Sequence, residues 1–242
     1  MPEMTEYTPG TPSWVDLGTP DLDKSIAFYT ALFGWEAHQA PQPEAGGYTM
    51  FTLDGKYVAG AGPLMSDQQP PAWSTYVSVI EADATVARAI ANGAMVFVEP
   101  MDVLDVGRMA VFADAEGAVI SVWEPKAHKG AQIVNEPNTY TWSELWSRDL
   151  HKAKEFYPEA FDWGYVDHGE GGPHGYTEWQ VDGRSIAGML QMGPEIPTQV
   201  PPHWVVYFAV ADTDAAVAKA NELGADDDGS DGHRARALRD PR

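Results

Sequence analysis

Apolar residues in the first part of the chain recur at helical spacing and then at strand spacing. A spacing of three or four positions predicts a helix over residues 21–33. Its apolar positions are Leu22, Ile26, Tyr29 and Phe33. We expect Thr19 or Asp21 to cap the start of this helix, and Gly34 to follow its last turn in the left-handed conformation that glycine adopts readily.

Shorter apolar runs, several of them alternating with polar residues, predict the strands around this helix. In the first half of the pattern, the expected strands span residues 13–17, 48–53 and 58–64, with Asp54-Gly55 as a hairpin turn. In the second half, the expected elements are a strand at 73–79, a helix at 83–92 and strands at 95–99, 109–113 and 118–123. A strand–helix–strand–strand–strand order, given twice, predicts an α+β fold with helices packed on one face of a curved sheet.

The second half of the chain repeats the first. At a spacing of 128 positions, Trp14 matches Trp142, Asp16 matches Glu144, Phe28-Tyr29 matches Phe156-Tyr157, Trp35 matches Trp163, Tyr48 matches Tyr176 and Gly60 matches Gly188. At a spacing of 131, Trp73 matches Trp204 and Gly93-Ala94 matches Gly224-Ala225. The repeat predicts a duplicated module with a three-residue insertion in the second copy. We place module 1 at residues 1–130 and module 2 at residues 131–225.

The second copy departs from the first in two places. Residues 226–242 form a tail rich in Asp, Gly and Arg, and no counterpart of residues 117–123 is found there. We therefore expect module 2 to be incomplete and this tail to be disordered or truncated. Pro158 lies in the second copy of the first helix, where Thr30 stands in the first copy. Because proline lacks the backbone N–H, we expect that helix to kink or to end early.

Composition narrows the range of partners. The formal net charge of −21 makes nucleic acid and anionic membranes unfavourable partners, because both are bound through clustered Lys and Arg. The chain has no cysteine, which excludes disulfides and thiolate chemistry. It shows no signal-peptide pattern and no apolar run long enough to span a bilayer, so we expect a cytoplasmic protein. The expected partner is a small-molecule ligand, and both a monomer and a homodimer stay open.

Three sequence motifs resemble the glyoxalase/bleomycin-resistance/dioxygenase superfamily, also called the vicinal oxygen chelate superfamily. They are the string DLDKSIAFYTALFGW at residues 21–35, the Asp114-Ala-Glu-Gly117 turn and the Gly107-Arg108-Met109 segment. The resemblance covers nearly the whole chain and is greatest for tandem two-module actinobacterial members, which often carry the label glyoxalase-like or hydroxylase. It implies tandem βαβββ modules that form cupped mixed β-sheets with helices outside and hold a small organic molecule in the cup.

In metal-dependent members of this family, a divalent ion binds in the cup through three positions. In module 1 these positions fall on Trp14, Ser74 and Ser121, and in module 2 the first two fall on Trp142 and Val205. Tryptophan and valine do not ligate metals and serine is a poor ligand, whereas such sites use His, Asp or Glu. The resemblance therefore implies no cofactor, although a divalent metal held by other groups stays open.

Side chains alternate across a strand, so the position of Trp14 also indicates which of its neighbours face the cup. Asp16 faces the cup with Trp14, and Glu144 does so with Trp142 and Trp146. The other expected ligand-binding residues are Tyr76, Ser78, Arg108, Ser121, Trp123 and Tyr207. An aromatic cavity with a few polar groups suits a planar or amphipathic organic molecule. The first tryptophan of each module either stacks on this ligand or plugs its cup.

Two functional classes fit these residues. The first is a metal-free binding module, similar to the antibiotic-sequestering members of the family. The second is a lyase or a hydroxylase- or oxygenase-like enzyme that uses Asp16 or Glu144 as a catalytic carboxylate, or a non-standard metal site. Arg108 is the expected ion-pair partner if Asp16 is only structural. Module 1 is the expected working copy, because it keeps the closing strand that carries Ser121 and Trp123.

Overall fold

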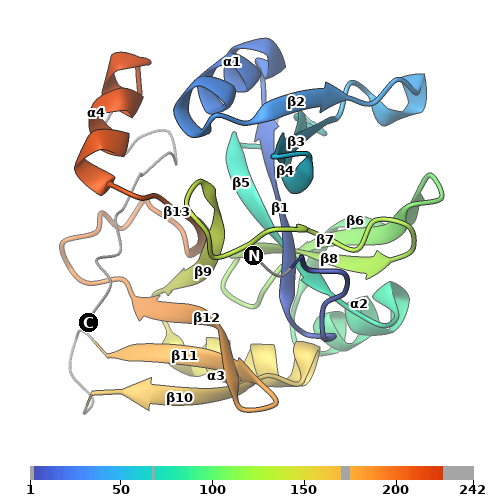
Figure 1. The fold of residues 1–242 in the computed structure, drawn as a ribbon. Helices are drawn as coiled ribbons and strands as arrows, with labels where there is room; N and C mark the ends of the chain where they lie inside the picture. Colours follow the sequence, from blue (N-terminus) through green and yellow to red (C-terminus); the bar gives the residue numbers. More distant parts are fainter. Residues whose placement is uncertain (1–2, 67–68, 170–174, 226–242) are drawn as a thin grey trace.

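The computed structural model describes residues 3–66, 69–169 and 175–225, which form two mixed β-sheets with helices packed against them (Figure 1). The first sheet and its helices comprise β1 (Pro12–Thr19), α1 (Leu22–Phe33), β2 (Glu36–Gln39), the short 3-10 helix η1 (Pro43–Ala45), β3 (Thr49–Leu53), β4 (Lys56–Pro63), β5 (Ala72–Ser78), α2 (Ala82–Ala91), β6 (Met95–Val103), β7 (Gly107–Ala113) and β8 (Val119–Pro125). The second sheet and its helices comprise β9 (Thr139–Ser147), α3 (Leu150–Phe161), β10 (Gly164–His168), β11 (Tyr176–Val181), β12 (Arg184–Gln191), β13 (His203–Ala209) and α4 (Thr213–Glu222).

The first sheet consists of two βαβββ units joined edge to edge. Its strand order is β2-β3-β4-β1-β5-β8-β7-β6, in which β1 pairs with β4 and β5 pairs with β8 in parallel. The antiparallel pairing of β1 with β5 joins the two units. The second sheet, with the order β10-β11-β12-β9-β13, repeats the first unit and continues with β13 and α4. The predicted α+β fold of tandem βαβββ modules is thereby confirmed.

The start and end of α1 follow from its sequence. The Asp21 side chain accepts a hydrogen bond from Lys24 N at 3.0 Å, and Gly34 follows the helix at a φ of 73°. The second copy uses an aspartate at both places, because Asp149 caps α3 and Asp162 follows it at a φ of 61°. The first helix of each copy therefore has the same length and the same kind of N-cap.

Two local features differ from the sequence-based expectations. β2 is a strand that the apolar pattern did not predict, because it lies at the sheet edge with all four residues exposed and needs no apolar face. α3 continues to Phe161 although Pro158 lies inside it, so the expected early end is wrong. Proline removes one N–H near the end of this helix, and the Pro158 carbonyl still accepts from Asp162 N at 2.8 Å.

The two copies hold each other through reciprocal tryptophan contacts. Trp35 Nε1 donates to the Asn138 carbonyl at 2.8 Å, and Trp163 Nε1 donates to the Gly10 carbonyl at 2.7 Å. Donors and acceptors of these two bonds are related by the same spacing of 128 residues. Each copy therefore satisfies a backbone carbonyl just before the first strand of the other.

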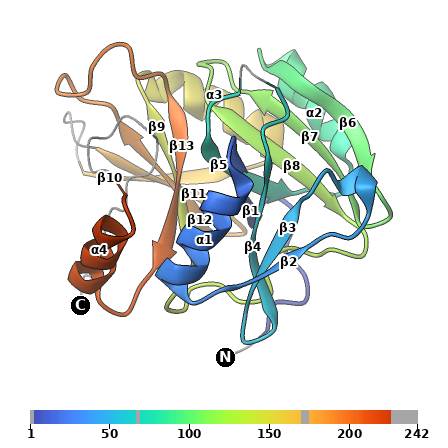
Figure 2. The same cartoon turned by 90° about the horizontal axis from the view of Figure 1, so that it is seen from above.

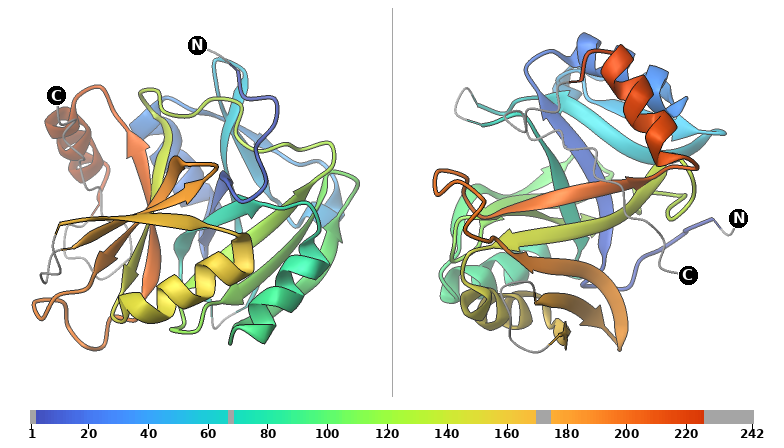
Figure 3. Two further views of the ribbon diagram at one scale, coloured as in Figure 1. Left: turned by 90° about the horizontal axis from the view of Figure 1, so that it is seen from below. Right: turned by 90° about the vertical axis from the view of Figure 1, so that its left-hand side faces the viewer.

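The helices pair across the same boundary. α2 lies beside α3, and α4 lies beside α1 (Figure 3). Arg88 of α2 donates to the Ala160 carbonyl near the end of α3 at 3.0 Å, and Lys219 of α4 donates to the Leu32 carbonyl near the end of α1 at 3.2 Å. Cations near helix C-termini also interact favourably with the helix dipole. The interface is therefore a pseudo-twofold arrangement of the two copies.

One continuous hydrophobic core joins the two sheets. It contains Phe112 and Ile120 of the first sheet together with Trp179 and Met189 of the second. α2 packs against β6, β7 and β8, and Figure 2 shows it beside β6 and β7. The helix-facing sides of both sheets are thus used for mutual packing, which leaves their other faces for the cups.

The remaining predictions concern membrane spans, the tail and the module boundaries. Among the described residues, no helix has the length and apolar character that crossing a membrane would require. The predicted tail at 226–242 lies outside the described residues, and the module boundaries stay predictions.

Replacing Tyr157 by Phe is expected to destabilise the protein more than the same change at its repeat counterpart, Tyr29. The buried Tyr157 hydroxyl donates to Asp114 Oδ2 at 2.8 Å and accepts from Trp204 Nε1 at 2.9 Å, whereas the Tyr29 hydroxyl accepts from Trp73 Nε1 at 2.9 Å. We expect losses of about 3 kcal/mol for Tyr157→Phe and about 1 kcal/mol for Tyr29→Phe in urea denaturation. Equal losses would show that the bridge to Asp114 contributes nothing.

Candidate functional site

The two faces of the first sheet have different roles, as side-chain alternation predicts. Val15 and Leu17 of β1 are buried in the core that includes α1. We call the opposite face the first cup, and the residues that strand register places on it include Trp14, Asp16, Ser74, Tyr76, Ser121 and Trp123. The matching face of the second sheet, which carries Glu144, is the second cup.

Asp16 is a carboxylate held by tyrosine hydroxyls in the first cup. The Tyr48 hydroxyl donates to Asp16 Oδ2 at 3.1 Å, and Tyr76 also forms a side-chain hydrogen bond with Asp16. Trp14 Nε1 donates in turn to the Tyr48 hydroxyl at 3.0 Å. Asp16 is half-buried, and its desolvation raises its pKa to about 6, although the two tyrosine hydrogen bonds act in the opposite direction. Asp16 therefore changes its protonation state just below neutral pH.

Tyr48 reaches this carboxylate because a glycine lies beneath its ring. The parallel register of β1 and β4 pairs Asp16 with Gly60, and a Cβ atom on Gly60 would lie 2.0 Å from the Tyr48 hydroxyl. A side chain at this position would push the hydroxyl away from Asp16. We did not predict Tyr48 as a site residue, although its recurrence together with Gly60 in the repeat was a usable signal.

The second cup repeats this arrangement around Glu144. The Tyr207 hydroxyl and Trp146 Nε1 each donate to Glu144 Oε1 at 2.8 Å. Trp142 Nε1 donates to the Tyr176 hydroxyl at 2.9 Å, and Tyr176 also forms a side-chain hydrogen bond with Glu144. Glu144 is only 5% exposed. Its carboxylate is therefore enclosed by donors from its own chain.

The two cups differ in the size of the residues beside the acid. In the first cup, neighbouring positions on β4, β1 and β5 carry Gly62, Gly18 and Ala72. In the second cup, the matching positions on β12, β9 and β13 carry Leu190, Trp146 and His203. The row beside Asp16 thus has no side chain larger than a methyl group, whereas bulky side chains stand beside Glu144.

The deeper part of the first cup is packed with aromatic rings. Trp14 is only 4% exposed, and its ring centroid lies 4.5 Å from that of His128 in an edge-to-face arrangement. Trp123 Nε1 donates to the His128 carbonyl at 2.8 Å. Burial lowers the pKa of His128 to about 4, so this imidazole is neutral at pH 7. Trp14 and Trp123 therefore form the floor of the cup, and this packing favours the plug interpretation of Trp14.

Arg108 does not line the first cup, contrary to our expectation. Its Nε and Nη2 atoms donate to Asp83 Oδ2 and Oδ1 of α2 at 2.7 and 3.0 Å. The register of β7 with β8 pairs Met109 with Trp123 on the cup side, so alternation turns Arg108 toward the helices. The expected ion pair between Arg108 and Asp16 is therefore wrong, and the partners of Asp16 are tyrosines.

The remaining predicted site residues divide between the two cups. Ser121 forms a side-chain hydrogen bond with Tyr76, and Ser78 lies opposite Trp123 across β5 and β8. Both serines are buried, so neither is directly accessible to a ligand. The structure brings Trp14, Asp16, Tyr76, Ser78, Ser121 and Trp123 together in the first cup, and Trp142, Glu144, Trp146 and Tyr207 in the second.

Apolar side chains border the first cup along β6, β7 and β8. By strand register, those on the cup side are Met95, Met101, Met109, Val111 and Val119. All of them are exposed or half-buried, and Met95 reaches 60% exposure. We call this set the methionine rim. Flexible thioether side chains adapt to ligands of varied shape, and an apolar border around a few polar groups is typical of small-molecule sites.

The donor atoms of the first cup do not fit a metal ion. The three family positions hold an indole and two hydroxyl groups, and the Asp16 carboxylate is bound by two tyrosines. Across residues 3–66, 69–169 and 175–225, no three His, Cys, Asp or Glu side chains gather closely enough to hold a metal. A divalent ion in proteins usually takes three or more such ligands. The usual metal chemistry of this fold therefore has no matching ligand set among these residues.

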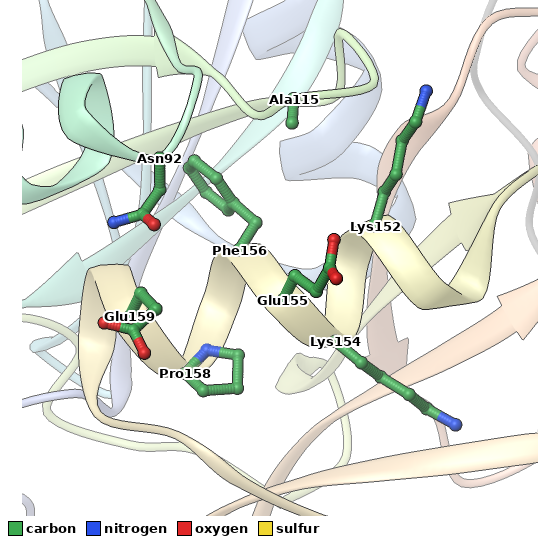
Figure 4. Close-up of a pocket in the computed structure, with 8 residues that line it drawn as sticks. All are labelled: Asn92, Ala115, Lys152, Lys154, Glu155, Phe156, Pro158 and Glu159. Atoms are coloured by element: carbon green, nitrogen blue, oxygen red, sulfur yellow. The ribbon is translucent and has the colours of Figure 1, made fainter.

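A separate depression of about 440 Å³ follows α3 on the helix side of the molecule (Figure 4). It is lined by Asn92, Ala115, Lys152, Lys154, Glu155, Phe156, Pro158 and Glu159. Its lining carries charges of both signs, and no cup residue contributes to it. It does not provide the convergent polar groups that a specific small-molecule site requires.

Known proteins similar to this chain include members of one superfamily. A family model described as the Glyoxalase/Bleomycin resistance protein/Dioxygenase superfamily matches residues 11–148, and one described as a glyoxalase-like domain matches residues 144–242. The chain is 40% identical to the anthracycline biosynthesis protein DnrV of Streptomyces peucetius over 237 residues. The aligned region covers 91% of this chain and 84% of DnrV.

Two solved structures share the fold at low sequence identity. The 2,2',3-trihydroxybiphenyl 1,2-dioxygenase of Sphingomonas wittichii has a TM-score of 0.60 at 14% sequence identity. The superposed region covers 90% of this chain and 80% of the dioxygenase chain. The Mn(II)-bound glyoxalase of Novosphingobium aromaticivorans has a TM-score of 0.59 at 17% sequence identity. The superposed region covers 89% of this chain and 70% of the glyoxalase chain. At these identities the likeness establishes the fold alone.

Asp16→Asn is expected to remove part of the pH dependence of stability. Folding raises the Asp16 pKa from 3.8 to about 6, so the folded state holds this proton more tightly than the unfolded state. The free energy of unfolding contributed by Asp16 therefore falls as the pH rises through that window, by on the order of 2–3 kcal/mol. Urea denaturation at pH 4 and pH 7 should show Asp16→Asn gaining this amount relative to the wild type.

Asp83→Asn serves as the control for this titration. The hydrogen bond from Arg108 lowers the pKa of the exposed Asp83 below 3.8, so its titration window lies below pH 4, and Asp83→Asn should keep nearly the wild-type pH dependence between pH 4 and pH 7. If Asp16→Asn and the wild type showed the same pH dependence, the charge on Asp16 would not be desolvated in the cup.

Proposed function

Because the chain belongs to the glyoxalase/bleomycin resistance protein/dioxygenase superfamily, as its motifs predict, we propose that it binds a planar aromatic molecule in the first cup. The observation that carries this proposal is the half-buried Asp16 carboxylate beside a row of glycine and alanine. A charge in an apolar cup costs free energy unless it is paired, and no cation pairs with Asp16 among the described residues. A ligand that donates a hydrogen bond to Asp16 would offset this cost.

The aromatic character of the ligand is supported by the lining and by one relative. The methionine rim offers apolar surface for a flat molecule, above a floor of buried rings. DnrV is named for anthracycline biosynthesis and is 40% identical to this chain. Anthracyclines are planar fused-ring molecules, so this identity supports a ligand of the same chemical kind.

Each residue around Asp16 then has a distinct role in binding. Asp16 accepts a hydrogen bond from the ligand, and Tyr48 and Tyr76 hold its carboxylate in place. Ser74, which is half-buried and lies opposite Asp16 on β5, supplies a second polar group at the same level of the cup. The ligand's rings would lie against the methionine rim.

A second function at the same site is proton abstraction from the bound molecule, in a reaction of the lyase or hydroxylase type. The pKa of Asp16, raised to about 6, favours this function because a general base works best with a pKa near the operating pH. Burial and the Asp16 charge raise the pKa of Tyr48 and Tyr76 well above their usual value, so both stay protonated. They would orient the carboxylate without competing for the abstracted proton.

The location and the other partners of the protein stay predictions. We propose that it binds neither nucleic acid nor anionic membranes, because its net charge of −21 would repel both. Its oligomeric state, monomer or homodimer, is left to measurement.

Asp16→Asn is expected to weaken the binding of planar phenols about tenfold or more, since a hydrogen bond to a charged acceptor contributes about 1.5–3 kcal/mol. The measurement is quenching of tryptophan fluorescence by 1-naphthol and by 1,2-dihydroxyanthraquinone. Glu144→Gln changes the matching acid of the second cup and should leave the affinity of the folded protein unchanged. If neither phenol bound the wild type, the proposed function would be wrong, and an unchanged affinity in Asp16→Asn would remove Asp16 from the site.

Mass spectrometry of the ligand after prolonged incubation separates the two functions. A binding protein returns the ligand unchanged, whereas a lyase or hydroxylase-like enzyme yields a product whose formation is lost in Asp16→Asn. With Asp16 as the base, kcat/KM should rise with pH around 6 as the carboxylate of the free protein ionises.

A further inference from the structure

In the second cup, a planar aromatic N–H group from the chain itself binds the acid. Trp146 Nε1 donates to Glu144 Oε1 at 2.8 Å, and its ring centroid lies 5.6 Å from that of His203. The same carboxylate oxygen accepts from the Tyr207 hydroxyl. Trp146 and Glu144 stand two residues apart on β9, so both side chains lie on the cup face. The indole is thus a flat neutral donor seated beside the carboxylate.

In the first cup, the position that matches Trp146 is Gly18. The spacing of 128 residues relates these two positions, and both lie two residues after the acid of their cup. The neighbours of Gly18 across the sheet are also small, because Gly62 and Ala72 stand where the second cup has larger residues. At these three strand positions the first cup therefore lacks the indole donor and the larger side chains of the second cup.

The space above Gly18 is bordered by Leu64 and Gln69. A Cβ atom on Gly18 would lie 2.7 Å from Gln69 Nε2 and 3.5 Å from Leu64 Cδ2. Gln69 is anchored through its Oε1 atom, which accepts from Met65 N at 2.7 Å. A ligand over Gly18 would have to displace this amide and its hydrogen bond from Met65 N. Because the amide ends a flexible side chain, this costs less than moving the packed indole at the same place in the second cup.

The polar groups left in the first cup match such an occupant. Tyr48 donates to Asp16 Oδ2 from one side, and Gly18 follows Asp16 on the same face of β1. Ser74 stands opposite Asp16, at the position that is Val205 in the second cup. At the level of the acid, the first cup therefore has a serine hydroxyl where the second has an apolar side chain. Its side chains there are also smaller.

Resting on the proposed function, we infer that the ligand of the first cup donates an aromatic ring N–H or O–H to Asp16 and lies over Gly18, where the second cup holds the Trp146 indole. The second cup thus contains, within its own chain, a stand-in for the ligand of the first. The ligand class is a flat, neutral, fused-ring heterocycle or phenol. The methionine rim would contact the rings beyond the first one.

The test uses indole and 1-benzofuran, which share one shape and differ in the N–H donor. Saturation-transfer NMR and calorimetric titration at pH 8 should show that indole binds the wild type at one site, and that 1-benzofuran binds about tenfold more weakly or not at all. Gly18→Trp should abolish indole binding, because it places in the first cup the residue that fills the second. Ala72→His narrows the same space without altering Gly18, and it should weaken indole binding even if Gly18→Trp fails to fold.

The outcomes separate this inference from the proposed function. If indole and 1-benzofuran bound equally well, or if indole binding survived in folded Gly18→Trp and in Ala72→His, the inference would be wrong while aromatic binding in the cup would stand. If phenols bound and indole did not, an indole-like placement over Gly18 would likewise be overturned. If no aromatic probe bound the wild type, the proposed function would fail together with the inference.

Discussion

A carboxylate in an apolar cup needs hydrogen-bond donors from its own chain, and here a tyrosine that crosses a glycine of the neighbouring strand provides one. Tyr48 lies over Gly60 in the first cup, and Tyr176 lies over Gly188 in the second. A Cβ atom on these glycines would lie only 2.0 and 1.9 Å from the respective hydroxyl oxygens. Each cup therefore contains one structural unit, which consists of an acid, the glycine that pairs with it on the neighbouring strand, and a tyrosine that lies over this glycine. The aromatic floor of the cup packs beneath this unit.

Duplication produced two copies of this unit, and the residue two positions after the acid separates their roles. Trp146 satisfies and encloses Glu144, whereas Gly18 leaves Asp16 half-buried next to small residues. Reciprocal contacts such as those of Trp35 and Trp163 tie the copies into one hydrophobic core. The second copy thereby stabilises the first while its own acid is occupied. In the proposed function, Asp16 of the first copy is the carboxylate that a ligand would reach.

Much of this arrangement could be predicted from the sequence, because it depends on local spacing. Alternation along β1 placed Asp16 and Trp14 on one face, and helical periodicity with Asp21 and Gly34 gave the limits of α1. Arg108 was misplaced because its orientation depends on the register of β7 with β8, which no local pattern reveals. Tyr48 was missed for a similar reason. Its contact with Asp16 crosses β4 and depends on the absence of a side chain at Gly60, so only the paired recurrence in the repeat could have indicated it.

The claim that Asp16 is the ligand's anchor is tested most directly by following its carboxyl carbon by NMR in protein labelled with ¹³C at aspartate and glutamate side chains. The account predicts that saturating 1-naphthol lowers the apparent pKa of Asp16 from about 6, because a donated hydrogen bond stabilises the ionised form. The Glu144 resonance should not move. A bound ligand that leaves the titration of Asp16 unchanged, or that shifts the Glu144 resonance instead, would contradict the account.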